Sequence, residues 1–183
     1  MKQVTAFLVL IFLMAGDLSA QTPTDHEIGF KFNNFRDFSL IYKNHLKDNK
    51  YLRLRSFNTN FGLSSFSSSL NLGVAVGLEN RRDLRSKLQL ISGPELGAFY
   101  SRFNVKESEE VTHSYTFQLG YVIGLQYAVK DNIRFGFEAI PAVSTAFSYD
   151  EDGFVDNSNS ISFTNGWGTA SVFAVYTFNG KEK

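Results

Sequence analysis

The 183-residue sequence has no cysteine, only three histidines, three prolines and one tryptophan, and no excess of charge of either sign. The absence of cysteine excludes a disulfide framework, a thiolate zinc site and a cysteine nucleophile. Eighteen Lys+Arg residues balance eighteen Asp+Glu residues, which fits poorly with a basic nucleic-acid-binding protein or a charged disordered tail. The sequence also lacks a glycine-rich phosphate loop and a basic aromatic patch, so we expect no nucleic-acid partner and no cofactor.

Aromatic residues and glycine are abundant, with nineteen Phe, eight Tyr and fourteen Gly. This composition favours strands and turns over helices. The mean hydropathy of −0.14 is that of an ordinary soluble domain. The order of the residues along the chain, however, predicts a different environment.

Residues 1–20 have the pattern of a secretory signal peptide. Lys2 precedes an apolar run over residues 4–14, and the segment after it ends on the small residue Ala20, where cleavage is expected. The alternative is an uncleaved anchor, but the run is shorter than the ~20 residues that a membrane-spanning helix needs. We therefore expect export through the Sec pathway and a mature domain over residues 21–183. No later segment is long and apolar enough to span a membrane as a helix, so a mature protein that spans a membrane must be a β-barrel.

Large apolar residues alternate with small or polar ones through most of the mature chain. The pattern is clearest over residues 115–129, where eight large apolar residues occupy every second position. After a Lys-Asp-Asn turn the pattern restarts at Ile133, which predicts a hairpin. The whole sequence predicts eight strands, over residues 27–33, 38–44, 51–61, 70–79, 87–103, 115–129, 133–144 and 161–178.

The connections between these strands are of two kinds. Short turns are expected at residues 47–50, 80–83 and 130–132, whereas residues 62–69, 104–112 and 150–160 form longer polar connections. Alternation of short and long connections is typical of an up-and-down barrel. Two irregularities are also expected, a one-residue bulge near Ser56 and a bulge or bend at residues 92–94. The predicted fold is therefore all-β, a single eight-stranded antiparallel up-and-down barrel.

The alternating pattern does not itself decide whether the apolar face points inward or toward lipid. The opposite face is rich in Gly, Ala, Ser, Asn and Gln and poor in charge, which suits the narrow interior of an eight-stranded barrel better than a water-exposed surface. The strands are also long enough for a bilayer, which needs about 9 to 11 residues per tilted strand, and aromatic residues gather near strand ends. We therefore predict a transmembrane barrel whose lipid-facing residues include Leu72, Val74, Val76, Leu119, Tyr121, Ile123, Leu125, Phe135 and Phe137.

These features together resemble the small outer-membrane β-barrel proteins, porin-like and eight-stranded, of Gram-negative bacteria. The resemblance includes the signal peptide, the eight alternating segments, the run from Asp48 to Arg55 and the terminal aromatic strand. It implies short periplasmic turns, longer external loops and insertion by the outer-membrane assembly machinery, which in many members reads a terminal strand that closes on an aromatic residue. Here Phe178 is followed by five further residues.

The predicted interior face carries four residues of each charge, and charges in a narrow lumen must be paired because an isolated charge costs several kcal/mol. We expect a salt-bridge network that fills the lumen. The alternative is an ion path lined by the same groups. The network residues are Glu27, Lys31, Arg53, Arg55, Glu79, Glu95, Arg134 and Glu138.

Catalysis has little support in the sequence. His113 and Ser114 lie beside acidic residues, but adjacent residues of a strand point to opposite faces and do not form a base–nucleophile pair. We expect no catalytic residues, with a lipid-modifying outer-membrane hydrolase as the residual alternative. The acidic runs at residues 107–110 and 150–156 lack the spacing of a calcium loop, so we expect no metal site and treat them as solvated loops.

The sequence therefore predicts an integral protein of the bacterial outer membrane with a structural or surface-interaction role in the cell envelope. Its expected partners are outer-membrane lipids, lipopolysaccharide and the assembly machinery, and we expect a monomer. One alternative is a narrow passive pore for ions or small solutes. A second is a secreted soluble barrel that binds an apolar ligand.

Overall fold

The structure is a computed structural model that describes residues 25–32, 38–105, 110–150, 153–162 and 170–179. The predicted signal peptide and the connection at residues 34–37 lie outside these residues. All regular structure in the described part is β-strand. The strands are β1 (Asp25–Phe32), β2 (Phe38–Lys47), β3 (Lys50–Leu63), β4 (Ser67–Arg85), β5 (Leu88–Val105), β6 (Glu110–Lys130), β7 (Ile133–Ala139), β8 (Ala142–Asp150), β9 (Gly153–Ser162) and β10 (Ser171–Asn179).

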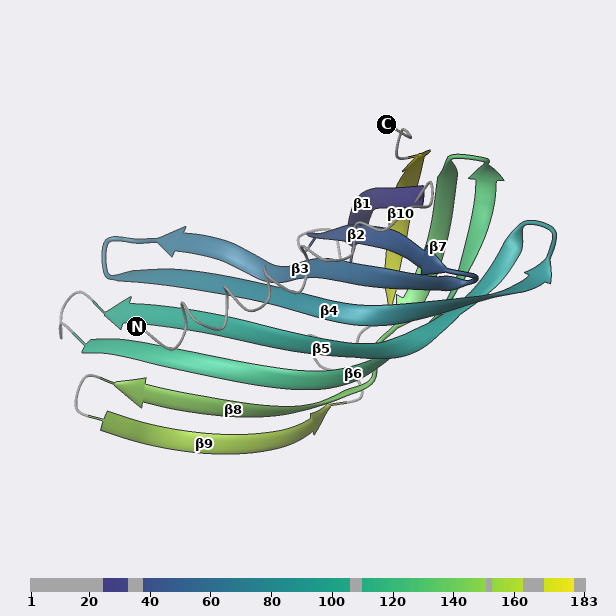
Figure 1. Cartoon of the computed structure of the whole chain (residues 1–183). Coiled ribbons are helices and arrows are strands. Elements are labelled where there is room, and N and C mark those ends of the chain that lie inside the picture. Colours follow the sequence, from purple (N-terminus) through teal and green to yellow (C-terminus); the bar gives the residue numbers. More distant parts are fainter. Residues whose placement is uncertain (1–24, 33–37, 106–109, 151–152, 163–169, 180–183) are drawn as a thin grey trace.

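Eight of these strands close into an antiparallel ring. Each strand from β1 to β6 pairs with the next, β7 pairs with β10, and β10 pairs back with β1. The remaining two strands extend the barrel wall beyond the ring. β8 pairs with the first half of β6, and β7 pairs with the second half of β6. β9 in turn pairs with β8. The predicted eight-stranded antiparallel barrel is confirmed, and Figure 1 shows β3, β4, β5, β6, β8 and β9 extending well past the closed end.

The predicted strand over residues 133–144 is divided in two by Ile140 and Pro141. Proline lacks the N–H that a strand interior must donate. The register with β6 is kept across this break, since Ile123 pairs with Ala139 and Gly120 with Ala142. Within the predicted strand over residues 161–178, the described part likewise consists of two strands, the end of β9 and β10, and residues 163–169 lie outside the described residues.

The strands are strongly tilted relative to the barrel axis. From Ile28, the chain of paired residues leads through β2 to β6 and on to Val143, whereas in the other direction it leads through Tyr176 to Ile133. This stagger of ten residues around eight strands, at ~3.3 Å per residue and ~4.8 Å between strands, requires a tilt of about 40°. Transmembrane and soluble barrels of this size have tilts of this order.

The alternation of the sequence becomes two distinct faces. Along β4, residues 73–81 alternate strictly between buried and exposed positions, with small or charged residues such as Ala75 and Glu79 buried and Val74 and Val76 exposed. A period of two is what a strand requires, because successive side chains point to opposite faces. The apolar residues of β4 therefore lie on the outside of the barrel.

The turn predicted at residues 80–83 is wrong. These residues continue β4, and the turn to β5 lies at Ser86 and Lys87 instead. Arg81 shares the interior face of Glu79 and donates to its carboxylate at 2.8 Å. The polar Asn-Arg-Arg-Asp run is thus part of a strand, and ion pairs hold its interior arginine. Turn propensity, which depends only on local sequence, does not detect such ion pairs.

Of the two predicted irregularities, one is confirmed. β3 has a one-residue bulge close to Ser56, between Phe57 and Asn60. Residues 92–94 produce no register shift, since β5 pairs continuously with β6 through this stretch. A Cβ atom on Gly93 would lie 1.8 Å from the carbonyl oxygen of Leu78, so the glycine allows close backbone approach without a bend.

The connections predicted as long loops are occupied largely by strand. β3 reaches Leu63 and β4 begins at Ser67, while β5 extends to Val105 and β6 begins at Glu110. β9 begins at Gly153, inside the third predicted connection. The β3–β4, β5–β6 and β8–β9 hairpins therefore extend the wall of the barrel at the end opposite the short turns.

The barrel interior is only partly polar, which corrects the predicted small and polar lumen. Six buried apolar side chains form a cluster inside it: Ile41, Ile91, Val122, Ile140, Phe173 and Val175. Most of them come from β5, β6 and β10 and from the break before β8. Packing them against each other fills the part of the lumen that the ion pairs do not occupy.

Candidate functional site

All eight predicted interior charges project into the barrel. Seven of them are buried, and the side chain of Arg134 is 19% exposed. They come from β1, β3, β4, β5 and β7, so tertiary structure joins groups that are far apart in the sequence. The structure adds Lys43 of β2 and Arg81 of β4 to the set. We call these ten residues the ion-pair network.

Arg53 is the centre of the network. Its guanidinium donates to Glu138 of β7 through both terminal nitrogens, with Nη1 2.6 Å from Oε2. It also lies 3.1 Å from Glu95 and 3.4 Å from Glu79. Lys31 adds a second cation to Glu138 at 2.9 Å. One arginine thus bridges carboxylates from three different strands across the lumen.

A second group of ion pairs lies around Glu27, nearer the turn end of the barrel. Both carboxylate oxygens of Glu27 accept hydrogen bonds from Arg81 at 2.7 Å. Arg134 donates to the same carboxylate at 2.5 Å and to the hydroxyl of Thr177 at 2.5 Å. Arg81 also stacks over the ring of Tyr51, with its guanidinium carbon 3.5 Å from the ring centroid. Each charge here is held from more than one direction.

Arg81 links the two groups, because it pairs with Glu79 at 2.8 Å as well as with Glu27. Lys43 pairs with Glu79 and was missed by the sequence analysis. It lies 2.7 Å from Glu79 and 4.7 Å from the ring centroid of Phe173. The described network therefore holds six cations and four carboxylates, in place of the four of each that the sequence predicted. Arg81 could have been found from the sequence, because the alternation that places Glu79 on the interior face continues to Arg81.

The network closes the lumen at its level. The side chains of Arg53, Lys43, Glu27 and Glu138 are fully buried, and those of Lys31 and Glu79 are 1% exposed or less. A water-filled path along these groups would leave them exposed. Charges so far from water are stable only when paired and hydrogen-bonded, so the network acts as a packed polar core.

The outer face carries the residues that the sequence predicted to face lipid. Of the nine, eight are between 44% and 60% exposed and Leu125 is half-buried. Aromatic side chains gather on this face toward both ends of the barrel. Near the hairpin tips Tyr100, Tyr115 and Tyr149 stack with each other or with His113. Near the turns His26 stacks on Phe178 and lies 2.7 Å from the hydroxyl of Tyr42.

The structure separates the one pair that could suggest a hydrolase. His113 lies on the outer face, 2.9 Å from the hydroxyl of Tyr100, whereas Ser114 contacts Ser148 at 2.8 Å. Within the described part of the chain no three His, Asp or Glu side chains are grouped so that they could hold a metal ion. The side chains of the acidic run at residues 107–110 and of residues 150–156 lie outside the described set.

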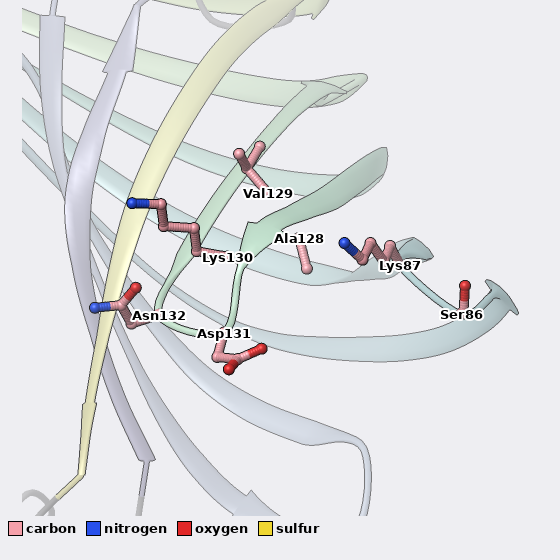
Figure 2. A pocket seen from close by; sticks show the side chains of 7 residues that line it. All are labelled: Ser86, Lys87, Ala128, Val129, Lys130, Asp131 and Asn132. Carbon is pink, nitrogen blue, oxygen red and sulfur yellow. The ribbon is translucent and has the colours of Figure 1, made fainter.

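A groove of about 700 Å³ lies at the turn end of the barrel, between the β4–β5 and β6–β7 turns. Figure 2 shows Lys87 and Lys130 on either side of Ala128 in this groove. Its lining also includes Ser86, Val129, Asp131 and Asn132. The charged side chains of the lining are Lys87, Lys130 and Asp131.

No protein-family model matches the sequence, and no curated protein matches it either. Solved structures with a similar fold include Ail, the attachment invasion locus protein of Yersinia pestis, which is 15% identical with a TM-score of 0.49 over 87% of this chain and 100% of that chain. A major outer membrane protein from Thermus thermophilus is 12% identical, with a TM-score of 0.48 over 86% of this chain and 100% of that chain. Neisserial surface protein A is 12% identical, with a TM-score of 0.38 over 84% of this chain and 90% of that chain. Similarities at this level assign neither location nor role, which depend on the two faces of the chain itself.

Proposed function

We propose that the chain is an integral barrel of the bacterial outer membrane that lies in lipid with its lumen closed by the ion-pair network. Its role is structural, or that of a surface-interaction protein in the cell envelope. The observation that carries this proposal is the inverted distribution of side chains. Arginine, lysine and glutamate are buried, while leucine, valine, phenylalanine and isoleucine are exposed around the outside.

A water-soluble barrel has the opposite arrangement. Lys, Glu and Arg are almost never fully buried in soluble proteins unless they are paired, and large contiguous apolar patches are rarely exposed. Here the exposed apolar residues continue over neighbouring strands of the ring, for example along the paired row Leu54, Val76, Leu96, Leu119. Lipid chains are the environment in which such a surface costs no free energy.

The height of the outer belt also fits a bilayer. Tyr115 and Tyr127 lie twelve residues apart on the outer face of β6. With a strand tilt of about 40°, this separation is about 30 Å along the barrel axis, close to the ~25 Å apolar band of outer-membrane barrels. Among the described residues, no helix is both long and apolar enough to cross a membrane.

The buried network supports a structural role over a conducting one. Fully buried side chains at the level of Arg53 and Glu138 leave no water path there. A narrow passive pore remains the second candidate, supported by the charged residues that reach the lumen from six strands. The third candidate, a secreted soluble barrel with an apolar ligand, requires the apolar face to point inward. The large exposed apolar side chains, such as Val74 and Leu119, speak against it.

The proposal implies partners and a route. Outer-membrane lipids and lipopolysaccharide would cover the belt, and the outer-membrane assembly machinery would insert the barrel after export through the Sec pathway. Phe178, near the end of β10, packs on His26 of β1 at the point where the ring closes. This aromatic residue is therefore suited to direct the closing step.

Detergent extraction of washed cell envelopes, followed by gel electrophoresis with and without boiling, tests the proposal. A membrane barrel stays with the envelope until detergent is added, and its folded form migrates differently from the boiled chain. Release by washing alone, without detergent, would support the soluble barrel and would remove the outer-membrane proposal.

A further inference from the structure

The tip of the β3–β4 hairpin differs from the other hairpin ends of the barrel in composition and exposure. No charged residue occurs between Arg55 and Glu79. Phe61, Leu63 and Phe66 are 66%, 68% and 67% exposed, the highest values for large apolar side chains among the described residues. By contrast, acidic residues occupy the sequence between β5 and β6 and between β8 and β9.

The tip is a fixed structure. The Ser64 side-chain oxygen accepts hydrogen bonds from the backbone N–H groups of Phe66 at 3.2 Å and Ser67 at 2.9 Å. The Ser64 N–H donates to the carbonyl of Ser67 at 2.8 Å. Because side-chain and backbone bonds both hold the turn, its large apolar side chains are presented in a defined arrangement.

The exposed side chains of the two strands lie on the same face as the lipid-facing belt. After the bulge of β3, Phe61 pairs with Leu70 and Leu63 with Ser68. Even-numbered residues of β4 point outward, as Leu72 and Val74 do. Phe61 and Leu63, together with Leu70, therefore extend the apolar outer face from Leu72 toward the tip of the hairpin.

The strand register places this tip at the same height along the barrel axis as Tyr115, one of the aromatic residues near the hairpin tips. Leu63 pairs with Ser68, Ser68 with Asn104 and Asn104 with Val111, which lies four residues beyond Tyr115. In a barrel tilted by about 40°, each residue along a strand rises ~2.5 Å along the barrel axis, and each step from β3 toward β6 rises ~3 Å. Leu63 and Tyr115 thus lie within about 1 Å of the same level.

We propose that the tip of the β3–β4 hairpin lies in the outer lipid interface, with Phe61, Leu63 and Phe66 in contact with lipid chains. The proposal depends on the outer-membrane location proposed above and adds to it an interaction surface with a defined occupant. Lipid is the occupant because the hairpin tip itself carries no charged residue and its apolar side chains adjoin the belt, with the exposed Arg102 of β5 lying beside Leu70 at its edge. This apolar surface ends at the level where the aromatic residues of β5 and β6 mark the interface. Of the three long hairpins, only β5–β6 and β8–β9 would then extend into water, on one part of the circumference of the barrel.

Cysteine labelling in lipid nanodiscs tests this placement, since the chain has no cysteine of its own and both faces of a nanodisc are open to reagents. The variants are Leu63→Cys and Phe66→Cys at the tip, Val76→Cys in the middle of the belt and Asn49→Cys in the exposed β2–β3 turn. A water-soluble maleimide should react with both tip cysteines roughly tenfold more slowly than with Asn49→Cys, because an apolar environment suppresses the thiolate.

Fluorophores on the same cysteines should be quenched by nitroxide lipids at different depths. A nitroxide near the headgroup should quench the two tip positions, and one near the chain end should quench Val76→Cys. If Val76→Cys is protected and the tip cysteines react as fast as Asn49→Cys, the hairpin inference fails while the outer-membrane proposal stands. If Val76→Cys also reacts as fast, the outer-membrane proposal fails too. Protection of the tip without quenching, lost on dilution into excess lipid, would indicate contact with a second copy and would contradict lipid as the occupant.

Discussion

Arg53 and Glu138 form a bidentate ion pair across the lumen, although their strands β3 and β7 are not neighbours in the sheet. Both side chains are fully buried. The pair ties opposite walls of the barrel together and places a cation and a carboxylate where neither could remain alone. The behaviour of this pair distinguishes a closed structural barrel from a conducting one.

Glu138→Gln should destabilise the folded barrel strongly. The substitution keeps the shape of the side chain but leaves Arg53 and Lys31 without the carboxylate that both contact. Breaking a buried pair in this way costs about 3–5 kcal/mol in the free energy of unfolding. Urea titration of the detergent-folded protein measures this cost, with Asp131→Asn in the exposed β6–β7 turn as the control. Equal stability of the two variants would show that the pair does not stabilise the fold.

The excess of cations in the network predicts an asymmetry between substitutions. Lys43→Met leaves Glu79 with Arg81 at 2.8 Å and Arg53 at 3.4 Å, so the carboxylate stays compensated. Glu79→Gln instead removes the shared partner of all three cations. Glu79→Gln should therefore lower the free energy of unfolding by more than Lys43→Met, by about 2 kcal/mol or more. The reverse order, measured by the same titration, would contradict the contacts described for Lys43.

A closed lumen predicts that the purified protein does not conduct. In planar lipid bilayers the wild-type barrel and Arg134→Ala should show no ion conductance above background, because the layer around Arg53 remains packed. The narrow-pore alternative makes the opposite prediction. A wild-type conductance that changes with Arg134→Ala or Glu138→Ala would replace the structural role by a pore.

Gly93 and Gly97, on the same strand, should respond differently to substitution by alanine. A Cβ atom on Gly93 would lie 1.8 Å from the Leu78 carbonyl oxygen, and its φ of 157° is unfavourable for other residues. On Gly97 the nearest atom would be 3.4 Å away, in the ring of Phe57. Gly93→Ala should therefore abolish or strongly reduce the folded, heat-modifiable species, while Gly97→Ala should change stability by less than about 1 kcal/mol. Equal yields of folded protein would contradict the close approach at Gly93.

The sequence predicts the barrel well because its information is periodic. The strict alternation from Tyr115 to Val129 corresponds to one face of β6, and the interior placement of Glu79 and Glu138 follows from the same parity. Interruptions of a strand are harder to predict. Pro141 divides β7 from β8 while the register continues past it, a tertiary outcome that no local pattern shows.

Lys43 shows how a single irregular residue hides a member of the network. A regular hairpin closed by Lys47 and Lys50 would place Lys43 opposite Leu54, on the outer face. The register shifts between His45 and Lys47, so that Lys43 instead lies opposite Arg53 on the inner face. The shift moves every residue before it to the other face, and nothing in the sequence marks where it occurs.

Solvent access to the outer face of β6 tests the central claim most directly. Leu119→Cys and Ile123→Cys, made singly and exposed in intact cell envelopes to a water-soluble thiol reagent, report whether the apolar face lies in lipid. The account predicts that both stay unlabelled until the barrel is unfolded, while Asn49→Cys reacts once the reagent is admitted to both sides of the membrane. Labelling of Leu119→Cys and Ile123→Cys in the folded protein, at the rate seen for Asn49→Cys, would contradict it.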